Sequence, residues 1–280
     1  MADKLIGKRY YKIDFELASA LSIGGNASYA TDKDIVYNGN GIPYIPATSL
    51  AGIYRSFFKT ETANKYFGSK TDFTDSRIYV YDAELKSDKY NVSKRDCVSL
   101  DEWKTSIKGS KFDFEIIEPE TKFVTYIEQN IYENINSENI EIDDNVGDVV
   151  ADMWAKEKIQ IGGKTSRGLG RVKNVSVKLK DFSFKSEEDK NKWFDFDIFD
   201  EKYWEDAVIW NSEKEKHWSE NIHTGKITLN LKMKQVSPII IRTYTTNKED
   251  SDYKPLTFTK YNTDGKEIKM PVIPGTSWAG

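Results

Sequence analysis

The sequence predicts an α+β fold of the ferredoxin-like (RRM-like) class with insertions, followed by the start of a second such domain. Three observations predict it: the order of strand and helix patterns, an octapeptide that occurs twice, and a strand pattern that restarts late in the chain. The octapeptide reads IPATSLAG at residues 45–52 and IPGTSWAG at residues 273–280. A repeat at this separation indicates a duplicated structural unit.

The first element is a half-buried strand, because the odd-numbered residues from Tyr11 to Ile23 are apolar except Ser19. The pattern ends at Gly24 and Gly25, and a polar loop follows over residues 26–41. An amphipathic helix comes next, with apolar residues at the spacing of one helical face: Leu50, Ile53, Tyr54, Phe57 and Phe58. We expect Thr48 or Ser49 to cap this helix by accepting a hydrogen bond from a first-turn N–H.

Further strands are predicted over residues 76–82, 111–117 and 122–128. A second helix has an apolar face of Val146, Val149, Val150, Met153 and Trp154. A glycine-rich segment and a last strand with Val175, Val177 and Leu179 complete the ferredoxin-like order.

Alternation restarts at Ile227, and the second octapeptide stands where the next helix should begin. We therefore expect a first domain over residues 1–180, an acidic, tryptophan-rich connector over residues 181–225 and the start of a second domain over residues 226–280. The second unit lacks the remainder of its fold, so we expect a fragment, a truncated reading frame or half of something that another polypeptide completes.

Composition restricts the possible chemistry. Cys97 is the single cysteine and the histidines are His217 and His223, too few for a disulfide or a structural zinc site. Any metal would therefore have oxygen ligands. No apolar run has the length of a membrane span, and no signal peptide is evident, which favours a cytoplasmic protein.

Charge is distributed unevenly along the chain, whose net charge is -4. Residues 151–180 contain eight basic and two acidic side chains, whereas residues 181–222 contain six basic and thirteen acidic ones. The basic stretch can bind a polyanion although the whole chain is acidic. Negative charge opposes a polyanion in the connector, so its tryptophans are predicted to pack: Trp193, Trp204, Trp210 and Trp218.

The segment IGGKTSRGLGRV at residues 161–172 is a candidate anion site. Its glycines allow backbone N–H groups to approach an anion, and three side chains supply positive charge. The residues concerned are Gly162, Gly163, Gly168, Lys164, Arg167 and Arg171. It is not a Walker motif, because Lys158 stands where the first glycine is needed. The alternative is a solvated turn with incidental charge.

Five motifs in order resemble the RAMP superfamily of CRISPR-associated proteins. They are the glycine-ended first strand, the IPATSLAG corner, SRIYVYDAE at residues 76–84, TKFVTYI at residues 121–127 and the glycine-rich loop. The likeness is greatest to the backbone subunits of type III antiviral effector complexes. It implies a domain that binds a CRISPR guide RNA beside other effector subunits or further RAMP domains, while base pairing reads the target RNA.

The resemblance also implies a catalytic aspartate in the loop after the first strand. Asp32 matches this position best and Asp34 is its competitor, although Lys33 and Asp34 follow where the family commonly has a small residue and proline. A carboxylate there could hold Mg²⁺ for a metal-dependent endoribonuclease. The alternative is that both are solvated carboxylates of a subunit that does not cut, and the absence of histidine from the first domain disfavours a guide-maturation nuclease.

RNA contacts are implied at Gly24, Gly25, Thr48, Ser49 and Arg55 as well as at the glycine-rich loop. A helix N-terminus with hydroxyl side chains can bind phosphate. Arg55 could reach the same phosphate or form a surface ion pair. Three functions follow as hypotheses: a guide-RNA-binding module with endoribonuclease activity, a non-catalytic architectural or capping RAMP subunit, and an unrelated ferredoxin-like protein that binds a small anion.

Overall fold

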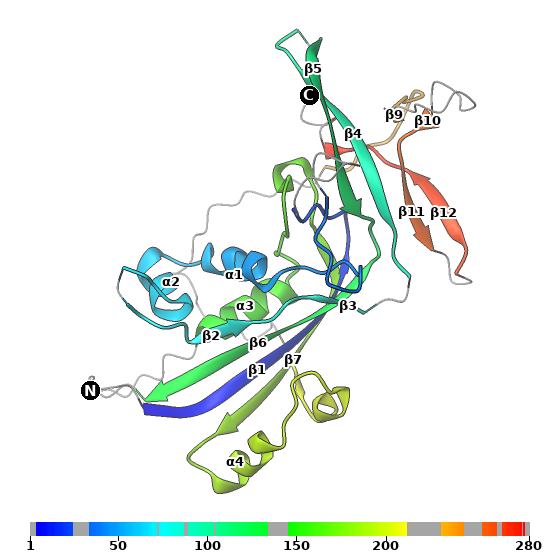
Figure 1. Cartoon of the computed structure of the whole chain (residues 1–280). Helices are drawn as coiled ribbons and strands as arrows, with labels where there is room; N and C mark the ends of the chain where they lie inside the picture. The colour runs from blue at the N-terminus through cyan, green and yellow to red at the C-terminus, as the bar shows by residue number, and fades with distance from the viewer. Residues whose placement is uncertain are drawn as a thin grey trace.

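The computed structural model describes residues 4–24, 34–71, 73–86, 89–103, 105–133, 145–211, 231–243, 254–261, 265–275 and 277. Its centre is a six-stranded antiparallel sheet in the order β2-β6-β1-β7-β8, with β3 also paired to β6 (Figure 1). These strands are β1 (Lys4–Leu17), β2 (Ile78–Val80), β3 (Glu84–Leu85), β6 (Lys122–Glu133), β7 (Val172–Ser183) and β8 (Val208–Ile209).

The four main strands and two crossover helices have the ferredoxin-like order. Helix α1 (Ala47–Arg55) connects β1 to β2, and α3 (Asn145–Ala155) connects β6 to β7. Because β6 lies between β1 and β2, and β1 lies between β6 and β7, each connection passes over one intervening strand. The ferredoxin-like prediction is therefore confirmed for the first domain.

One face of the sheet packs against helices α1 and α3. The odd-numbered residues in the second half of β1 face this layer and are buried: Tyr11, Ile13, Phe15 and Leu17. Trp154 of α3 packs against Phe15 with the ring centroids 4.6 Å apart and the ring planes tilted by 42°. Its indole N–H donates to the hydroxyl of Tyr54 at 3.0 Å. This layer is the main hydrophobic core.

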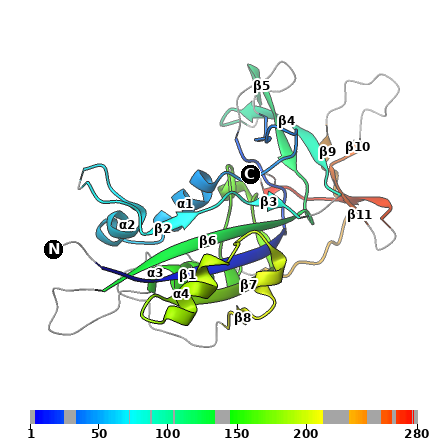
Figure 2. The ribbon, with the colours of Figure 1, turned by 60° about the horizontal axis from the view of Figure 1, so that its bottom comes forward.

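The opposite face is covered by the connector. Helix α4 (Glu187–Phe194) and the 3₁₀ helix η2 (Glu201–Trp204) lie across β1 and β7 (Figure 2). Trp193 donates to the hydroxyl of Tyr10 at 2.8 Å, and Trp204 donates to the carbonyl of Ile198 at 2.9 Å. The prediction that these tryptophans pack is confirmed, also for Trp210, which contacts the main core. Trp218, His217 and His223 lie outside the described residues.

Four smaller features lie beyond the sheet. β4 (Val92–Leu100) and β5 (Ser106–Ile117) form a long hairpin that projects from it, and α2 (Thr60–Phe67) follows α1 (Figure 1). Towards the C-terminus are two strand pairs: β9 (Arg242–Thr243) with β10 (Lys254–Pro255), and β11 (Thr257–Tyr261) with β12 (Glu267–Pro271). None of the helices in the described ranges is long and apolar enough to cross a membrane.

The first strand differs from its predicted bounds. It starts at Lys4 and ends at Leu17, whereas the apolar alternation continues to Ile23. The ladder ends there because the next residues make different bonds: Ala18 N–H donates to the carbonyl of Arg171 at 2.8 Å, and Leu21 N–H donates to that of Ile117 at 2.9 Å. Residues 18–24 thus leave the sheet, and the glycine-rich loop described below is hydrogen-bonded to them.

Candidate nucleic-acid interface

The glycine-rich loop, residues 161–171, is tied to the segment that follows β1. Gly163 N–H donates to the carbonyl of Ser22 at 2.7 Å, and Gly170 N–H donates to that of Ala20 at 2.9 Å. From inside, the side-chain amide of Gln160 donates to the carbonyls of Thr165 at 3.0 Å and Leu169 at 3.2 Å. The loop therefore has a defined shape.

Glycine is needed in this loop for both conformation and space. Gly162 and Gly170 have φ values of +77° and +76°, and a Cβ atom would lie 2.3 Å from the Ser22 oxygen at the first position and 1.8 Å from the Ile161 oxygen at the second. Gly168 has φ +86°, but open space surrounds its missing side chain. Gly163, Gly168 and Gly170 donate their N–H groups within the protein, so these three groups are not available to an anion.

The three loop cations differ in their surroundings. Lys164 adopts a left-handed conformation, and its ammonium lies 4.8 Å and 4.3 Å from the ring centroids of Phe112 and Phe114 on β5. Arg167 and Arg171 are exposed, and their guanidinium groups form no hydrogen bond or ion pair with the described residues. They are the loop side chains best placed to bind phosphate.

Other cations of the basic stretch are engaged within the protein. Lys156 pairs with Asp152 at 2.8 Å, and Lys173 pairs with Glu16 at 2.9 Å. On the connector side, Lys178 donates to the carbonyl of Trp204 at 3.1 Å, and Lys180 pairs with Asp206 at 2.6 Å. Apart from Lys158, which is exposed, the positive charge that this stretch offers to a ligand is therefore concentrated at the glycine-rich loop.

The loop also faces the projecting β4–β5 hairpin. Burial raises the pKa of the Cys97 thiol on β4, while the positive charges of Lys164 and Arg167 oppose that rise. The contacts of Lys164 with the two phenylalanines on this side were not predicted from the sequence. The alternating KFDFEII segment predicts a strand but not which loop its phenylalanines contact.

The loop predicted to be catalytic starts beside this cationic loop. Gly24 pairs with Ile35 in an antiparallel bridge, and Ser22 is the residue against which Gly162 packs. Asp32 and Gly25 lie outside the described residues, so only the stem of the loop is placed. That stem brings the start and the end of the segment together next to the glycine-rich loop.

Carboxylates gather at the end of this stem. Glu115 accepts hydrogen bonds from the Ile35 N–H at 3.2 Å and the Tyr37 hydroxyl at 3.3 Å. Burial, together with the charges of Glu115 and Asp34, raises the pKa of Tyr37 to about 12. Asp34 is half-buried, and its Oδ1 is buried without a hydrogen-bond partner among the described residues. Within the described ranges, no group of three or more Asp, Glu, His or Cys side chains is placed to hold a metal ion.

The cap of helix α1 differs from the prediction. The helix begins at Ala47, whose N–H donates to Asp82 Oδ1 at 2.6 Å, and no side chain at the helix start caps it. The predicted cap by Thr48 or Ser49 is wrong because the helix starts before both residues. Asp82 belongs to the SRIYVYDAE motif, but only the fold brings it to this helix. Its negative charge lies at the helix N-terminus, where a phosphate was expected.

The remaining predicted contacts lie near this corner. Thr48 is exposed beside a cavity of about 330 Å³ between α1 and β2. Arg55 donates to the carbonyls of Ala63 at 3.3 Å and Gly68 at 2.9 Å, and it also bonds Asn64. The Arg55 guanidinium thus joins α1 to α2, and a phosphate contact by this side chain stays a prediction.

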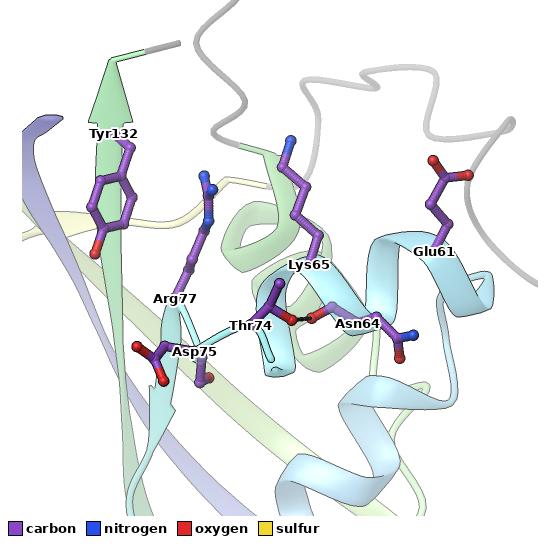
Figure 3. Close-up of a pocket in the computed structure, with 8 residues that line it drawn as sticks. Glu61, Asn64, Lys65, Thr74, Asp75, Arg77 and Tyr132 are labelled. Carbon is purple, nitrogen blue, oxygen red and sulfur yellow. Dashed lines mark hydrogen bonds between the residues drawn. The ribbon is translucent and has the colours of Figure 1, made fainter. Parts of the chain in front are cut away.

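A second hollow of about 410 Å³ lies between α2, β2 and the end of β6, at Tyr132 (Figure 3). The Arg77 guanidinium lies 4.9 Å from the Tyr132 ring centroid, and Lys65 extends beside it. Glu61 and Asp75 also line the hollow, so its charge is mixed. Tyr132 pairs with Leu5 at the start of β1, which places this hollow at the opposite end of the sheet from the glycine-rich loop.

One of the comparisons with known proteins identifies a family. The family model described as the RAMP superfamily matches residues 14–173, a range that contains the helix corner and the glycine-rich loop. No curated protein matches the chain. Among solved structures, the chain resembles one chain of the cryo-EM structure of the Type III-B Cmr-beta bound to cognate target RNA, with a TM-score of 0.46 and 18% identity. That match covers 61% of each of the two chains.

Proposed function

Because the chain belongs to the RAMP superfamily, we propose that it is a guide-RNA-binding subunit or module of a type III CRISPR effector complex. Its partners would be a CRISPR guide RNA, target RNA and other effector subunits in the cytoplasm. The observation that carries the proposal is the exposure of Arg167 and Arg171 on a loop that adjoins the stem of the Asp32 segment. Family membership also rules out the hypothesis of an unrelated anion-binding protein.

The fold favours a particular route for RNA. RRM domains stack bases on the open face of their sheet. In this chain both faces are covered, one by α1 and α3 and the other by α4 and η2. RNA would therefore cross the end of the sheet, where Arg167 and Arg171 lie, and the contacts would be to the phosphate backbone rather than to bases.

Two substitutions test this binding mode. We expect Arg167→Gln with Arg171→Gln to weaken binding of a fluorescently labelled single-stranded guide RNA, measured by anisotropy across a salt series. Loss of two phosphate contacts should make the slope of log affinity against log salt shallower by about 1.4, since each contact to single-stranded RNA contributes about 0.7.

The matched control is Lys190→Gln with Lys192→Gln, which removes the same charge from α4 on the far face. These lysines form only exposed pairs with Glu187 and Glu188, so little stability should be lost. An equal weakening in both double variants would mean that binding depends on net charge, and the assignment of the loop would fail.

Catalysis is a second step of the proposal. Asp32 and Asp34 would hold a Mg²⁺ ion, and the unpartnered Oδ1 of Asp34 is a described oxygen that suits a cation. The ion, when bound, would supply Lewis-acid stabilisation of charge on the scissile phosphate. Arg167 and Arg171 would hold the neighbouring phosphates, and the Gly24–Ile35 bridge would keep the acidic segment next to them.

Asp32→Ala separates the catalytic from the architectural reading. Under the catalytic reading, the variant loses Mg²⁺-dependent cleavage of target RNA and keeps wild-type affinity for the guide. Asp34→Ala, measured in parallel, shows which carboxylate is essential. If both variants cut as the wild type does, the assignment of catalysis to these two carboxylates is wrong. If the wild type does not cut at all, the chain is a non-catalytic RAMP subunit.

A further inference from the structure

The second octapeptide forms the same backbone turn as the first. Ser49 N–H donates to the carbonyl of Pro46 at 2.9 Å, and Ser277 N–H donates to that of Pro274 at 2.9 Å. Gly275 is helical, as is Ala47 at the equivalent position of the first copy. The two helix corners therefore share a local conformation. Their sequences differ at the third and sixth residues of the octapeptide, and the third is described in both copies.

The second corner lies directly on the glycine-rich loop. A Cβ atom on Gly275 would be 2.0 Å from the carbonyl oxygen of Arg167 and 2.6 Å from its carbonyl carbon. Gly275 is not one of the residues with positive φ in the described part of the chain, so its backbone conformation does not require glycine. The missing side chain serves the close approach of two backbones.

Neighbouring contacts hold the same segment against the first domain. The hydroxyl of Tyr261 on β11 donates to Asn91 Oδ1 at 2.9 Å, and Lys260 lies 3.8 Å from Glu120. Val272 N–H donates to the carbonyl of Leu256 at 3.0 Å, which links the corner to this hairpin. The contact at Gly275 is thus part of a larger joint.

The first corner has a different environment. Ala47 carries the side chain that Gly275 lacks, and its N–H is bound by Asp82. It lines the 330 Å³ cavity between α1 and β2, and no described segment is packed on it as Gly275 is packed on Arg167. An approach as close as that of Gly275 would bring the Ala47 methyl group into a carbonyl.

We infer that the glycine-rich loop is a docking site for the second helix corner, and that glycine at the third octapeptide position is what permits docking. The carbonyl of Arg167 faces the corner, while its exposed side chain stays available for RNA. The first corner, with Ala47, does not accept such a loop from a second copy of the chain. This inference goes beyond RNA binding and does not depend on it.

Trypsin tests the contact, because the carbonyl of Arg167 belongs to the bond that trypsin cleaves. We expect Gly275→Ala to speed cleavage after Arg167 by roughly tenfold, since overpacking displaces the corner. The matched exchange Ala47→Gly at the other corner should leave that rate unchanged. Equal rates in Gly275→Ala and the wild type, with both folded by circular dichroism, would overturn the inference.

A second experiment keeps Gly275 intact. Ser166→Cys and Ser277→Cys, in a Cys97→Ser background, place thiols on the exposed residues next to the contact. A short bis-maleimide should link them within one chain, independently of protein concentration. No cross-link, or cross-linked dimers alone, would contradict docking within the chain. Neither measurement uses RNA, so its failure is distinct from failure of the proposed function.

Discussion

Gly170 shows how a single residue sets the shape of the candidate interface. We expect Gly170→Ala to lower the free energy of unfolding by about 1–2 kcal/mol for its left-handed backbone and by about 1–3 kcal/mol more for the clash with Ile161. Gly168→Ala is the matched control, because its φ is also positive while its surroundings are open. Urea unfolding measures both.

The difference in unfolding free energy between Gly170→Ala and Gly168→Ala isolates the cost of the clash with Ile161. If Gly168→Ala destabilises as much as Gly170→Ala, the close approach of Ile161 to Gly170 makes no separate contribution. The loop would then be held only by the conformational preference of its glycines.

The helix cap at Asp82 makes a second prediction at this scale. Asp82→Ala removes the acceptor of the Ala47 N–H and should lower the free energy of unfolding by about 1 kcal/mol. Thr48→Ala should have little effect, since Thr48 is exposed and does not cap the helix. If Thr48→Ala destabilised the protein more than Asp82→Ala in thermal or urea unfolding, Thr48 would be the cap, as the sequence predicts.

At the scale of elements, the connector covers the face of the sheet opposite to helices α1 and α3. Trp204 is fully buried and hydrogen-bonded, whereas Phe194 at the end of α4 is 74% exposed. Trp204→Ala should cost about 3–5 kcal/mol of unfolding free energy. Phe194→Ala should change it by less than about 0.5 kcal/mol.

Measuring RNA affinity tests whether the connector has a role besides stability. Folded Trp204→Ala protein, at a temperature where it remains native, should bind guide RNA as the wild type does because the connector lies away from Arg167. A selective loss of RNA affinity in the folded variant would show that the connector face takes part in binding.

The central elements could be predicted because their patterns are local. Alternation in β1 and the apolar face of α3 are each set by residues close in sequence. One consequence of the alternation is wrong. A polar residue such as Lys12 should lie on a solvated face, yet Lys12 is 1% exposed and paired with Glu201 of η2. β4 was missed, since its sequence VSKRDCVSL contains mostly polar residues.

The candidate site was predictable to the extent that its residues are contiguous. The glycines and cations of residues 161–171 stand together in the sequence, which is why the loop could be identified. Asp82, Phe112 and Gly275 take part through contacts between distant segments. Neither spacing nor residue type reveals such contacts before the fold is known.

At the scale of the whole molecule, Glu118 lies where the sheet and the projecting hairpins meet. It is 2% exposed, accepts a hydrogen bond from Ser93 and lies 3.6 Å from Arg95. Burial raises the pKa of Glu118, although Ser93, Arg95 and the backbone of Thr259 oppose the rise. This carboxyl therefore links protonation to the packing of the hairpins.

The sign of the effect follows from the raised pKa. The folded state holds the Glu118 proton more tightly than the unfolded chain does, so this contribution to stability is complete below the ordinary pKa of 4.5 and is lost as pH rises through the raised value. We expect Glu118→Gln to exceed the wild type in unfolding free energy at pH 7 but not at pH 4. Parallel pH profiles of the two proteins in urea would contradict this expectation.

The central position of β1 has a consequence for synthesis of the chain. Its partners, β6 and β7, end at Glu133 and Ser183, so the first strand made must wait for the last main strand of the sheet. At about 5–20 residues per second, that wait is roughly 10–30 s on the ribosome. Until β6 has been made, the alternating apolar residues of β1 have no native strand to pair with. Until β7 follows, one edge of β1 stays open and can aggregate.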